Sequence, residues 1–301
     1  MSNVIRCDGA TKYFGRVHAV EDLSFGVDPG EVVGFLGPNG AGKTTTIRML
    51  LDLVRPTRGR VSVLGRDPRS GGPELRRRIG YVPGDLALYP RLTGAQLLDF
   101  LAALRGLPNP ANAIGALAER LEVDLGRRLG TLSRGNRQKL GVIQAFVHSP
   151  DVLLLDEPTS GLDPVVQREV RALVREATDR GAAVLLSSHV LAEVQRVADR
   201  VAIVRQGRLV TIEPMHEIEA RALRVVELRF AGPVPLSAFA NLPCVQSVEL
   251  DGDLLRASVV GPVDPLVKAA AHFRVESISG HEADLEDAFL AYYAETPNAA
   301  A

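Results

Sequence analysis

The sequence VVGFLGPNGAGKTT, residues 32–45, joins a run of apolar residues to a glycine-rich turn that ends in lysine and threonine. The apolar run predicts a buried strand, and residues 45–53 have the pattern of a helix. Residues 37–44 therefore match the GxxxxGK[ST] phosphate-binding loop in the strand–turn–helix context that this motif requires. Backbone N–H groups of such a loop point at phosphate oxygens. The predicted nucleotide-binding residues are Gly37, Pro38, Asn39, Gly40, Ala41, Gly42, Lys43, Thr44 and Thr45.

Four side chains, in two places of the sequence, have the chemistry of metal-assisted phosphate hydrolysis. Lys43 is long enough to reach the β- and γ-phosphates, and the Thr44 hydroxyl can ligate Mg²⁺. The apolar run 152–155 ends in Asp156 and Glu157. At the end of a strand parallel to the first, Asp156 can hold Mg²⁺ through water, and Glu157 can orient and deprotonate the attacking water. We therefore predict a magnesium-dependent site with Glu157 as its catalytic base.

Continuous apolar runs at 32–36, 152–155 and 183–186 predict the strands of a buried parallel sheet. A polar turn and a helical pattern follow each run. This order indicates an α/β fold with helices on both faces of the sheet.

A helical insertion is predicted at about residues 86–130, between the first and second of these runs. Thr93 and Gln96 have the spacing of a capping box. The helix that they open has one apolar stripe, formed by Leu97, Leu101 and Leu104. A second helix follows a linker that contains proline.

The composition changes after Gly207, where short strand patterns begin. Strands are predicted at 224–230, 245–250, 254–260 and 275–279, and helices at 265–273 and 284–293. We therefore predict a first domain at 1–217, a small α+β domain at 218–294 and a disordered tail at 295–301.

The composition excludes several classes of protein. Of 301 residues, 46% are hydrophobic and 24% are charged, which is typical of a globular chain rather than a disordered one. With 35 Lys and Arg against 36 Asp and Glu, the net charge of -1 gives no electrostatic reason to expect a nucleic acid partner. Cys7 and Cys244 do not indicate a disulfide framework or a zinc site. No apolar run approaches the ~20 residues that a bilayer requires, so we expect a cytoplasmic chain.

Three further motifs follow the phosphate loop: LSRGNRQ at 132–138, SGLD at 160–163 and His189. With these motifs, residues 4–215 resemble the ATP-binding subunit of ATP-binding cassette (ABC) transporters. They are similar to that family's signature, D-loop and switch histidine. The resemblance implies that the first predicted domain is an α/β cassette of the P-loop NTPase ABC type, with a mixed sheet core and a helical subdomain.

The resemblance also implies roles for individual residues. Phe14 is similar to the aromatic residue that stacks on adenine, with Tyr13 as the adjacent alternative. Ser133 and Gly135 match the signature positions that contact the γ-phosphate of ATP bound to the opposite subunit. His189 would hydrogen-bond the same phosphate as a catalytic residue. ATP and Mg²⁺ are the implied cofactors.

Two departures from the family pattern concern residues near the phosphates. Arg134 and Asn136 stand where the signature usually has Gly and Gln. Gly84 stands where the family has a glutamine, or a glutamate in some exporters, that ligates Mg²⁺ or touches the attacking water. Either Asp85 replaces it as a metal ligand, or a water does, or turnover is slower. Of these alternatives we favour Asp85.

The family's signature faces away from the nucleotide of its own chain, so the resemblance implies two subunits that meet head to tail around two ATP molecules. The second subunit would be another copy of this chain or a different ATPase subunit. An integral membrane permease docking near residues 84–93 would place the chain on the inner face of the cell membrane. Residues 161–164 and 284–290 resemble the export branch, which handles drugs, polyketides, lipids or polysaccharides. The alternatives are a non-transport cassette ATPase and a regulatory subunit with weak hydrolysis.

Overall fold

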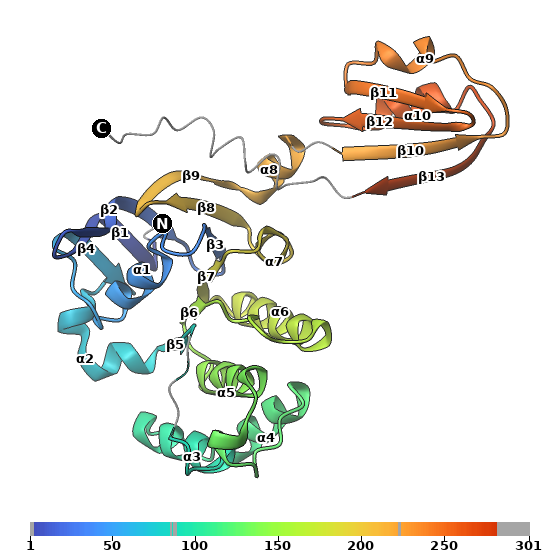
Figure 1. Cartoon of the computed structure of the whole chain (residues 1–301). Coiled ribbons are helices and arrows are strands. Elements are labelled where there is room, and N and C mark those ends of the chain that lie inside the picture. The colour runs from blue at the N-terminus through green and yellow to red at the C-terminus, as the bar shows by residue number, and fades with distance from the viewer. Residues whose placement is uncertain (1–2, 85, 87–88, 222–223, 282–301) are drawn as a thin grey trace. The chain divides into compact units, whose positions relative to one another are not determined.

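The computed structural model describes residues 3–84, 86, 89–221 and 224–281 of the chain (Figure 1). The chain divides into two compact units, Met1–Ile212 and Glu213–Ala301. None of the helices in the described ranges is long and apolar enough to cross a membrane.

A six-stranded sheet forms the centre of the first unit, with the strand order β5-β6-β7-β3-β8-β9. Its strands are β3 (Val32–Leu36), β5 (Ile79–Val82), β6 (Val152–Asp156), β7 (Ala183–Ser188), β8 (Arg200–Arg205) and β9 (Arg208–Pro214). The strands from β5 to β8 pair in parallel. Every residue of β3, β6 and β7 is buried, which confirms the three strands predicted from continuous apolar runs.

The carboxyl ends of β3, β6 and β7 meet at one edge of this sheet, because the three strands are parallel neighbours. In their register, Leu36 pairs with Ser188, and Asp156 pairs with Ser187. The phosphate loop follows Leu36, and His189 follows Ser188. The topology therefore brings motifs that are far apart in the sequence to the edge where ligands of open α/β sheets bind.

A three-stranded antiparallel sheet, with the order β2-β1-β4, completes the core of this unit. Its strands are β1 (Ile5–Phe14), β2 (Val17–Val27) and β4 (Arg58–Val63). Their buried side chains join those of the central sheet in one hydrophobic cluster. In the β1–β2 hairpin, Phe14 pairs with Val17, so Phe14 lies at the tip.

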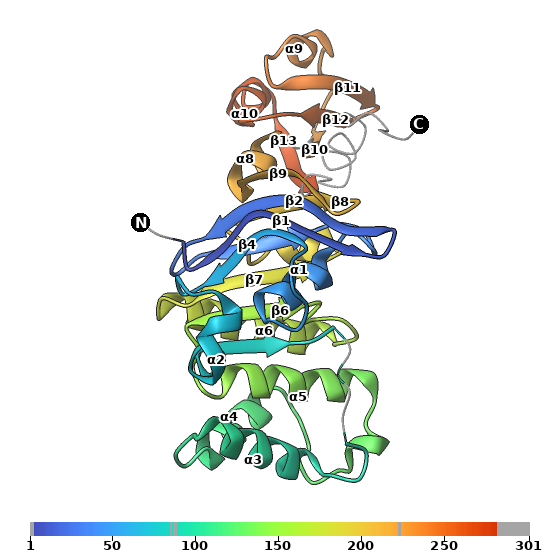
Figure 2. The ribbon, with the colours of Figure 1, turned by 90° about the vertical axis from the view of Figure 1, so that its left-hand side faces the viewer.

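Helices accompany the central sheet and also form a separate group next to β5 (Figure 2). The helices beside the sheets are α1 (Lys43–Leu50), α2 (Pro68–Arg77), α6 (Pro164–Asp179) and α7 (Leu191–Gln195). The separate group contains α3 (Gly94–Arg105), α4 (Ala111–Arg120) and α5 (Arg134–Phe146), with a 3-10 turn at Leu129–Thr131. Within it, α5 packs against α3, α4 and β5.

The capping box predicted at the start of α3 is present. The Thr93 Oγ1 atom accepts a hydrogen bond from the Gln96 N–H at 3.3 Å, and the Gln96 side chain accepts one from the Thr93 N–H at 2.9 Å. The predicted apolar stripe is wrong at Leu104, which is 63% exposed. Because α3 packs against α5, its buried face is slightly rotated from the predicted stripe. The large side chains of that buried face are Leu97 and Leu98, with Ala102 beside them.

The second unit contains a four-stranded antiparallel sheet with the order β11-β12-β10-β13. Its strands are β10 (Arg224–Phe230), β11 (Val245–Asp251), β12 (Leu254–Val259) and β13 (Val275–His281), and its helices are α8 (Met215–Arg221), α9 (Ser237–Ala240) and α10 (Asp264–Ala270). The four strands and α10 confirm the elements predicted there, whereas α9 was not predicted. From β10 onward the element order is that of a split βαβ motif. The predicted helix at 284–293 and the predicted tail lie outside the described residues.

Candidate nucleotide-binding and hydrolysis site

The predicted phosphate loop leaves β3 and turns into α1, as its motif requires. Gly40 and Gly42 have φ values of 80° and 101°, in the left-handed region that favours glycine. At Gly42 a Cβ atom would also lie 2.5 Å from the carbonyl oxygen of Ala19. A larger residue there would strain the loop and displace β2, so the glycine is tied to the curled shape of the loop.

Lys43, the first residue of α1, turns its side chain back into this loop. Its Nζ atom donates hydrogen bonds to the carbonyl oxygens of Gly37 at 2.6 Å and Pro38 at 3.2 Å. The Oε1 atom of Glu157 lies 3.7 Å from the same nitrogen. Burial lowers the pKa of the Lys43 ammonium, and the charges of Glu157 and Asp156 partly oppose this shift. The ammonium is therefore held by carbonyl groups that phosphate oxygens can replace.

Asp156 is buried at the carboxyl end of β6. Its Oδ1 atom accepts a hydrogen bond from Ser187 Oγ at 2.6 Å, and its Oδ2 atom faces Gly84, where a Cβ atom would lie 3.4 Å away. Thr44, which carries a hydroxyl group, is among the residues that line the cavity of the phosphate loop. A carboxylate and a hydroxyl are oxygen ligands of the kind that Mg²⁺ prefers, so these two residues fit a magnesium ion beside the phosphates. Asp85, the third predicted ligand, lies outside the described residues.

Glu157 follows Asp156 in a turn with an unusual backbone, because its φ is 51°. This left-handed conformation is strained for a residue other than glycine. The Glu157 N–H is held by the carbonyl oxygen of Ser187 at 3.2 Å and by its Oγ at 3.1 Å. The Glu157 carboxylate contacts His189, whose Nδ1 lies 2.8 Å from Oε2. The structure thus brings both predicted catalytic residues together, next to Lys43.

A cavity of about 370 Å³ lies against the phosphate loop. Residues 39–45 and Glu157 line it together with Phe14. Gly37 and Pro38 hold the lysine ammonium of the loop instead. The cavity falls within the range of about 300–1,000 Å³ that is usual for small-molecule sites. Most of the predicted nucleotide-binding residues therefore surround one cavity of suitable size.

The tip of the β1–β2 hairpin adds an aromatic wall to this cavity. The Phe14 ring lines the cavity, and the Lys12 Nζ atom lies 5.0 Å from its centroid. Tyr13, the alternative, turns toward His18, with 4.2 Å between the ring centroids. Val17 and His18 also line the cavity, although no sequence motif singled them out. Val17 and His18 lie at the cavity because the hairpin pairs them with Phe14 and Tyr13, respectively.

Phe14→Ala is expected to weaken ATP binding about 5- to 150-fold, because stacking of a base on an aromatic ring contributes ~1–3 kcal/mol. The matched control is Phe100→Ala, because Phe100 on α3 is 49% exposed against 50% for Phe14. Titration of both variants with a fluorescent ATP analogue gives the Kd values. Equal affinity in Phe14→Ala and wild type would contradict the stacking role.

The signature-like stretch forms the start of α5 and packs on the D-loop of its own chain. Ser133 caps the helix with its Oγ atom. At Gly135 a Cβ atom would lie 2.6 Å from the carbonyl oxygen of Gly161. Arg134 Nη2 donates a hydrogen bond to Ser160 Oγ at 3.2 Å. Among the described residues that line the phosphate-loop cavity, neither of the two predicted signature contacts, Ser133 and Gly135, is present.

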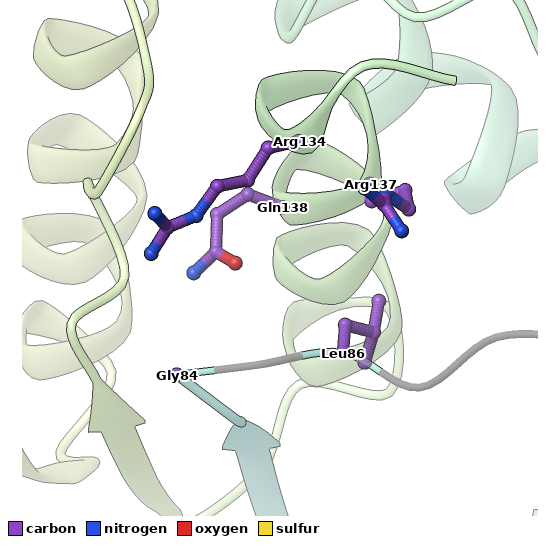
Figure 3. Close-up of a pocket in the computed structure, with 5 residues that line it drawn as sticks. All are labelled: Gly84, Leu86, Arg134, Arg137 and Gln138. Atoms are coloured by element: carbon purple, nitrogen blue, oxygen red, sulfur yellow. The ribbon is translucent and has the colours of Figure 1, made fainter. Parts of the chain in front are cut away.

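A second cavity, of about 390 Å³, lies between the end of β5 and α5. Figure 3 shows Gly84 at the end of β5 and the side chains of Arg134 and Gln138 extending from α5 into this space. Gly84 has no side chain to fill the space next to Asp156. The departure from the family pattern at this position therefore coincides with a cavity beside the predicted magnesium ligand.

Known proteins are similar to this chain over most of its length. The chain matches the family described as ABC transporter over residues 20–160. It is 36% identical to the bacitracin transport ATP-binding protein BcrA of Bacillus licheniformis over 234 residues, which cover 77% of this chain and 76% of that protein. It is also 36% identical to the Nod factor export ATP-binding protein I of Burkholderia pseudomallei, over 90% of both chains. Among solved structures, an ATP binding subunit of an ABC transporter matches with a TM-score of 0.68 at 30% identity, over 72% of this chain and 92% of that chain.

Proposed function

Since the chain belongs to the ABC transporter family and is an ATPase of the ABC type, we propose that it drives the export of a substrate through a separate membrane permease. The observation that carries the hydrolysis step of this proposal is the contact between Glu157 and His189, whose Oε2 and Nδ1 atoms lie 2.8 Å apart beside the cavity of the phosphate loop. The name of the bacitracin transport protein supports a role in transport, and the name of the Nod factor export protein supports its direction.

The residues of the site account for hydrolysis of the terminal phosphate. The backbone N–H groups of the phosphate loop and the Lys43 ammonium bind the β- and γ-phosphates. Asp156 and Thr44 would hold Mg²⁺, which when bound would offset the negative charge of these phosphates. Glu157 takes a proton from the water that attacks the γ-phosphorus, and ADP leaves. His189, which contacts the Glu157 carboxylate, hydrogen-bonds the γ-phosphate.

A complete site requires two chains. Ser133 caps its own helix, Gly135 packs against Gly161 of its own D-loop, and neither belongs to the described lining of the phosphate-loop cavity of its own chain. A second copy, or another ATPase subunit, supplies the same positions to the γ-phosphate across a head-to-tail interface. ATP then stabilises the closed dimer because both subunits contact it, and hydrolysis removes that contact. Opening and closing of the dimer is the step that drives transport.

The helical group carries the surface proposed for the permease. Phe100 and Leu104 are exposed one turn apart on α3, and Tyr89, just before this helix, is exposed as well. Exposed apolar side chains gathered on one segment are typical of protein interfaces. Docking of a permease at this surface places the chain on the inner face of the cell membrane.

The double variant Phe100→Asp with Leu104→Asp is expected to bind the permease at least about tenfold more weakly, with ATP affinity unchanged, because interface anchors carry most of the binding energy. The matched control is Leu53→Asp, since Leu53 and Leu104 are both 63% exposed and Leu53 lies outside the helical group. Co-purification of the tagged chain with membrane proteins from solubilised native membranes measures the binding. Recovery equal to wild type in the double variant would place the docking surface elsewhere.

A further inference from the structure

The strained backbone of Glu157 is held on both sides. A non-glycine residue with a φ of 51° keeps this conformation only where its surroundings fix it. On the amino side, Ser187 holds the Glu157 N–H. On the carboxyl side, Gln138 Nε2 donates hydrogen bonds to the carbonyl oxygens of Glu157 at 3.1 Å and Pro158 at 3.3 Å. The Gln138 amide therefore holds the backbone carbonyl groups of Glu157 and Pro158 in place.

Gln138 reaches these carbonyl groups from α5, the helix that begins with the signature. Its side chain is buried, and Figure 3 shows its amide directed out of the helix at the cavity of Gly84. Burying an amide costs free energy unless the amide is hydrogen-bonded, so the two hydrogen bonds to the Glu157 turn fix the position of the Gln138 side chain. Without the donor, the turn loses a restraint next to its strained residue.

We propose that Gln138 is a positioning residue for ATP hydrolysis, which holds the turn of Glu157 so that its carboxylate stays aligned with His189 and the attacking water. This inference rests on the proposed role of Glu157 as the base. Gln138 contacts no reacting atom and acts through Glu157. Ser133 caps the start of the same helix, and in the proposed dimer it faces the nucleotide of the opposite subunit. The helix α5 therefore joins one nucleotide site to the catalytic base of the other.

Gln138→Met keeps the length of the side chain and removes its donor. We expect kcat to fall about 10- to 100-fold and the Kd for ATP to change less than about twofold, because small errors in position are costly in catalysis. The matched control is Gln144→Met, since Gln144 lies on the same helix and its Nε2 donates to the carbonyl oxygen of Tyr81 at 3.2 Å. The control should keep kcat within about twofold of wild type. Thermal unfolding checks that each variant folds. If Gln138→Met does not fold, Gln138→Glu replaces it, because glutamate has the same size and lacks the amide donor.

A double variant separates positioning from a general loss of structure. With Glu157→Gln no base is left to align, so adding Gln138→Met should lower the residual kcat by less than about twofold. Three results would each overturn the inference. The double variant could lose kcat by the product of the two single losses, the folded Gln138 variants could keep the wild-type kcat, or Gln144→Met could lose as much kcat as Gln138→Met. Failure of the proposed function looks different, because the wild-type chain would then not hydrolyse ATP, or Glu157→Gln would hydrolyse it normally.

Discussion

Glu157→Gln is expected to lower kcat for ATP hydrolysis by about 10²- to 10⁴-fold, the usual contribution of a general base. The amide has the size of the carboxylate and can still contact His189, but it cannot accept the proton of the attacking water. ATP binding should persist, since the loop and the Lys43 ammonium are unchanged. Release of inorganic phosphate at saturating ATP gives kcat, and titration with nucleotide gives the Kd.

The same variant should accumulate as an ATP-bound dimer, because the contact that closes the dimer is not removed by hydrolysis. Light scattering after size exclusion should show the 32.3 kDa chain shifting to about twice its mass when ATP is added. The matched control is Glu122→Gln, since Glu122 also has a positive φ, of 53°, and lies outside the site. A Glu157→Gln chain that stays monomeric with ATP while hydrolysing it normally would remove the assignment of the base.

Lys43→Met is expected to raise the Kd for ATP about 10- to 100-fold, a loss of ~1.4–2.8 kcal/mol, and to abolish measurable hydrolysis. The Lys43 ammonium is the one buried cation among the described residues of the phosphate loop, and it is already poised on carbonyl oxygens of that loop. Methionine preserves the apolar stem and removes the charge that the phosphates require.

Lys139→Met is the matched control for this prediction. Lys139 is 8% exposed against 6% for Lys43, but its Nζ atom contacts the carbonyl oxygen of Glu122, at 3.5 Å, away from the cavity. Its ATP affinity should equal that of wild type, so that loss of a buried lysine alone is excluded as the cause. Calorimetric titration with ATP compares the two, and equal affinities for both variants would contradict the role of Lys43.

The parallel core could be predicted from the sequence because its strands are buried on both faces. Such strands appear as unbroken apolar runs, and β3 ends where the run at 32–36 ends. The phosphate loop and the acidic pair Asp156–Glu157 follow directly from these strands. Once the strand ends are known, the meeting of the motifs at one edge follows from parallel pairing.

The resemblance implied a mixed sheet core, but the strands β1, β2 and β4 of the antiparallel sheet were not predicted, so part of the cavity was missed. The β1–β2 pairing has register shifts, so the regular alternation of a half-buried strand is interrupted. Val17 and His18 line the cavity only through that hairpin. The prediction that Leu104 is buried was wrong for a related reason. The buried face of α3 depends on how α5 packs against it and not on the helical pattern alone.

Contacts of the site beyond the motifs depended on the tertiary structure. Ser187 holds both the Asp156 carboxylate and the Glu157 N–H, yet it appears in the sequence only as the polar end of a strand. Gln138 stood within the signature-like stretch, but only its hydrogen bonds to Glu157 and Pro158 point to a role. These contacts join residues far apart in the chain, and no local spacing encodes them.

The proposal that each site is built from two chains is tested most directly by mixing two inactive chains, Lys43→Met and Ser133→Arg. If each site combines Lys43 of one chain with Ser133 of another, a mixed dimer keeps one intact site. An equal mixture should then regain about a quarter of the wild-type ATPase rate, because half of the dimers are mixed and each has one of two sites intact. A mixture as inactive as its two components, with dimers present, would contradict the account.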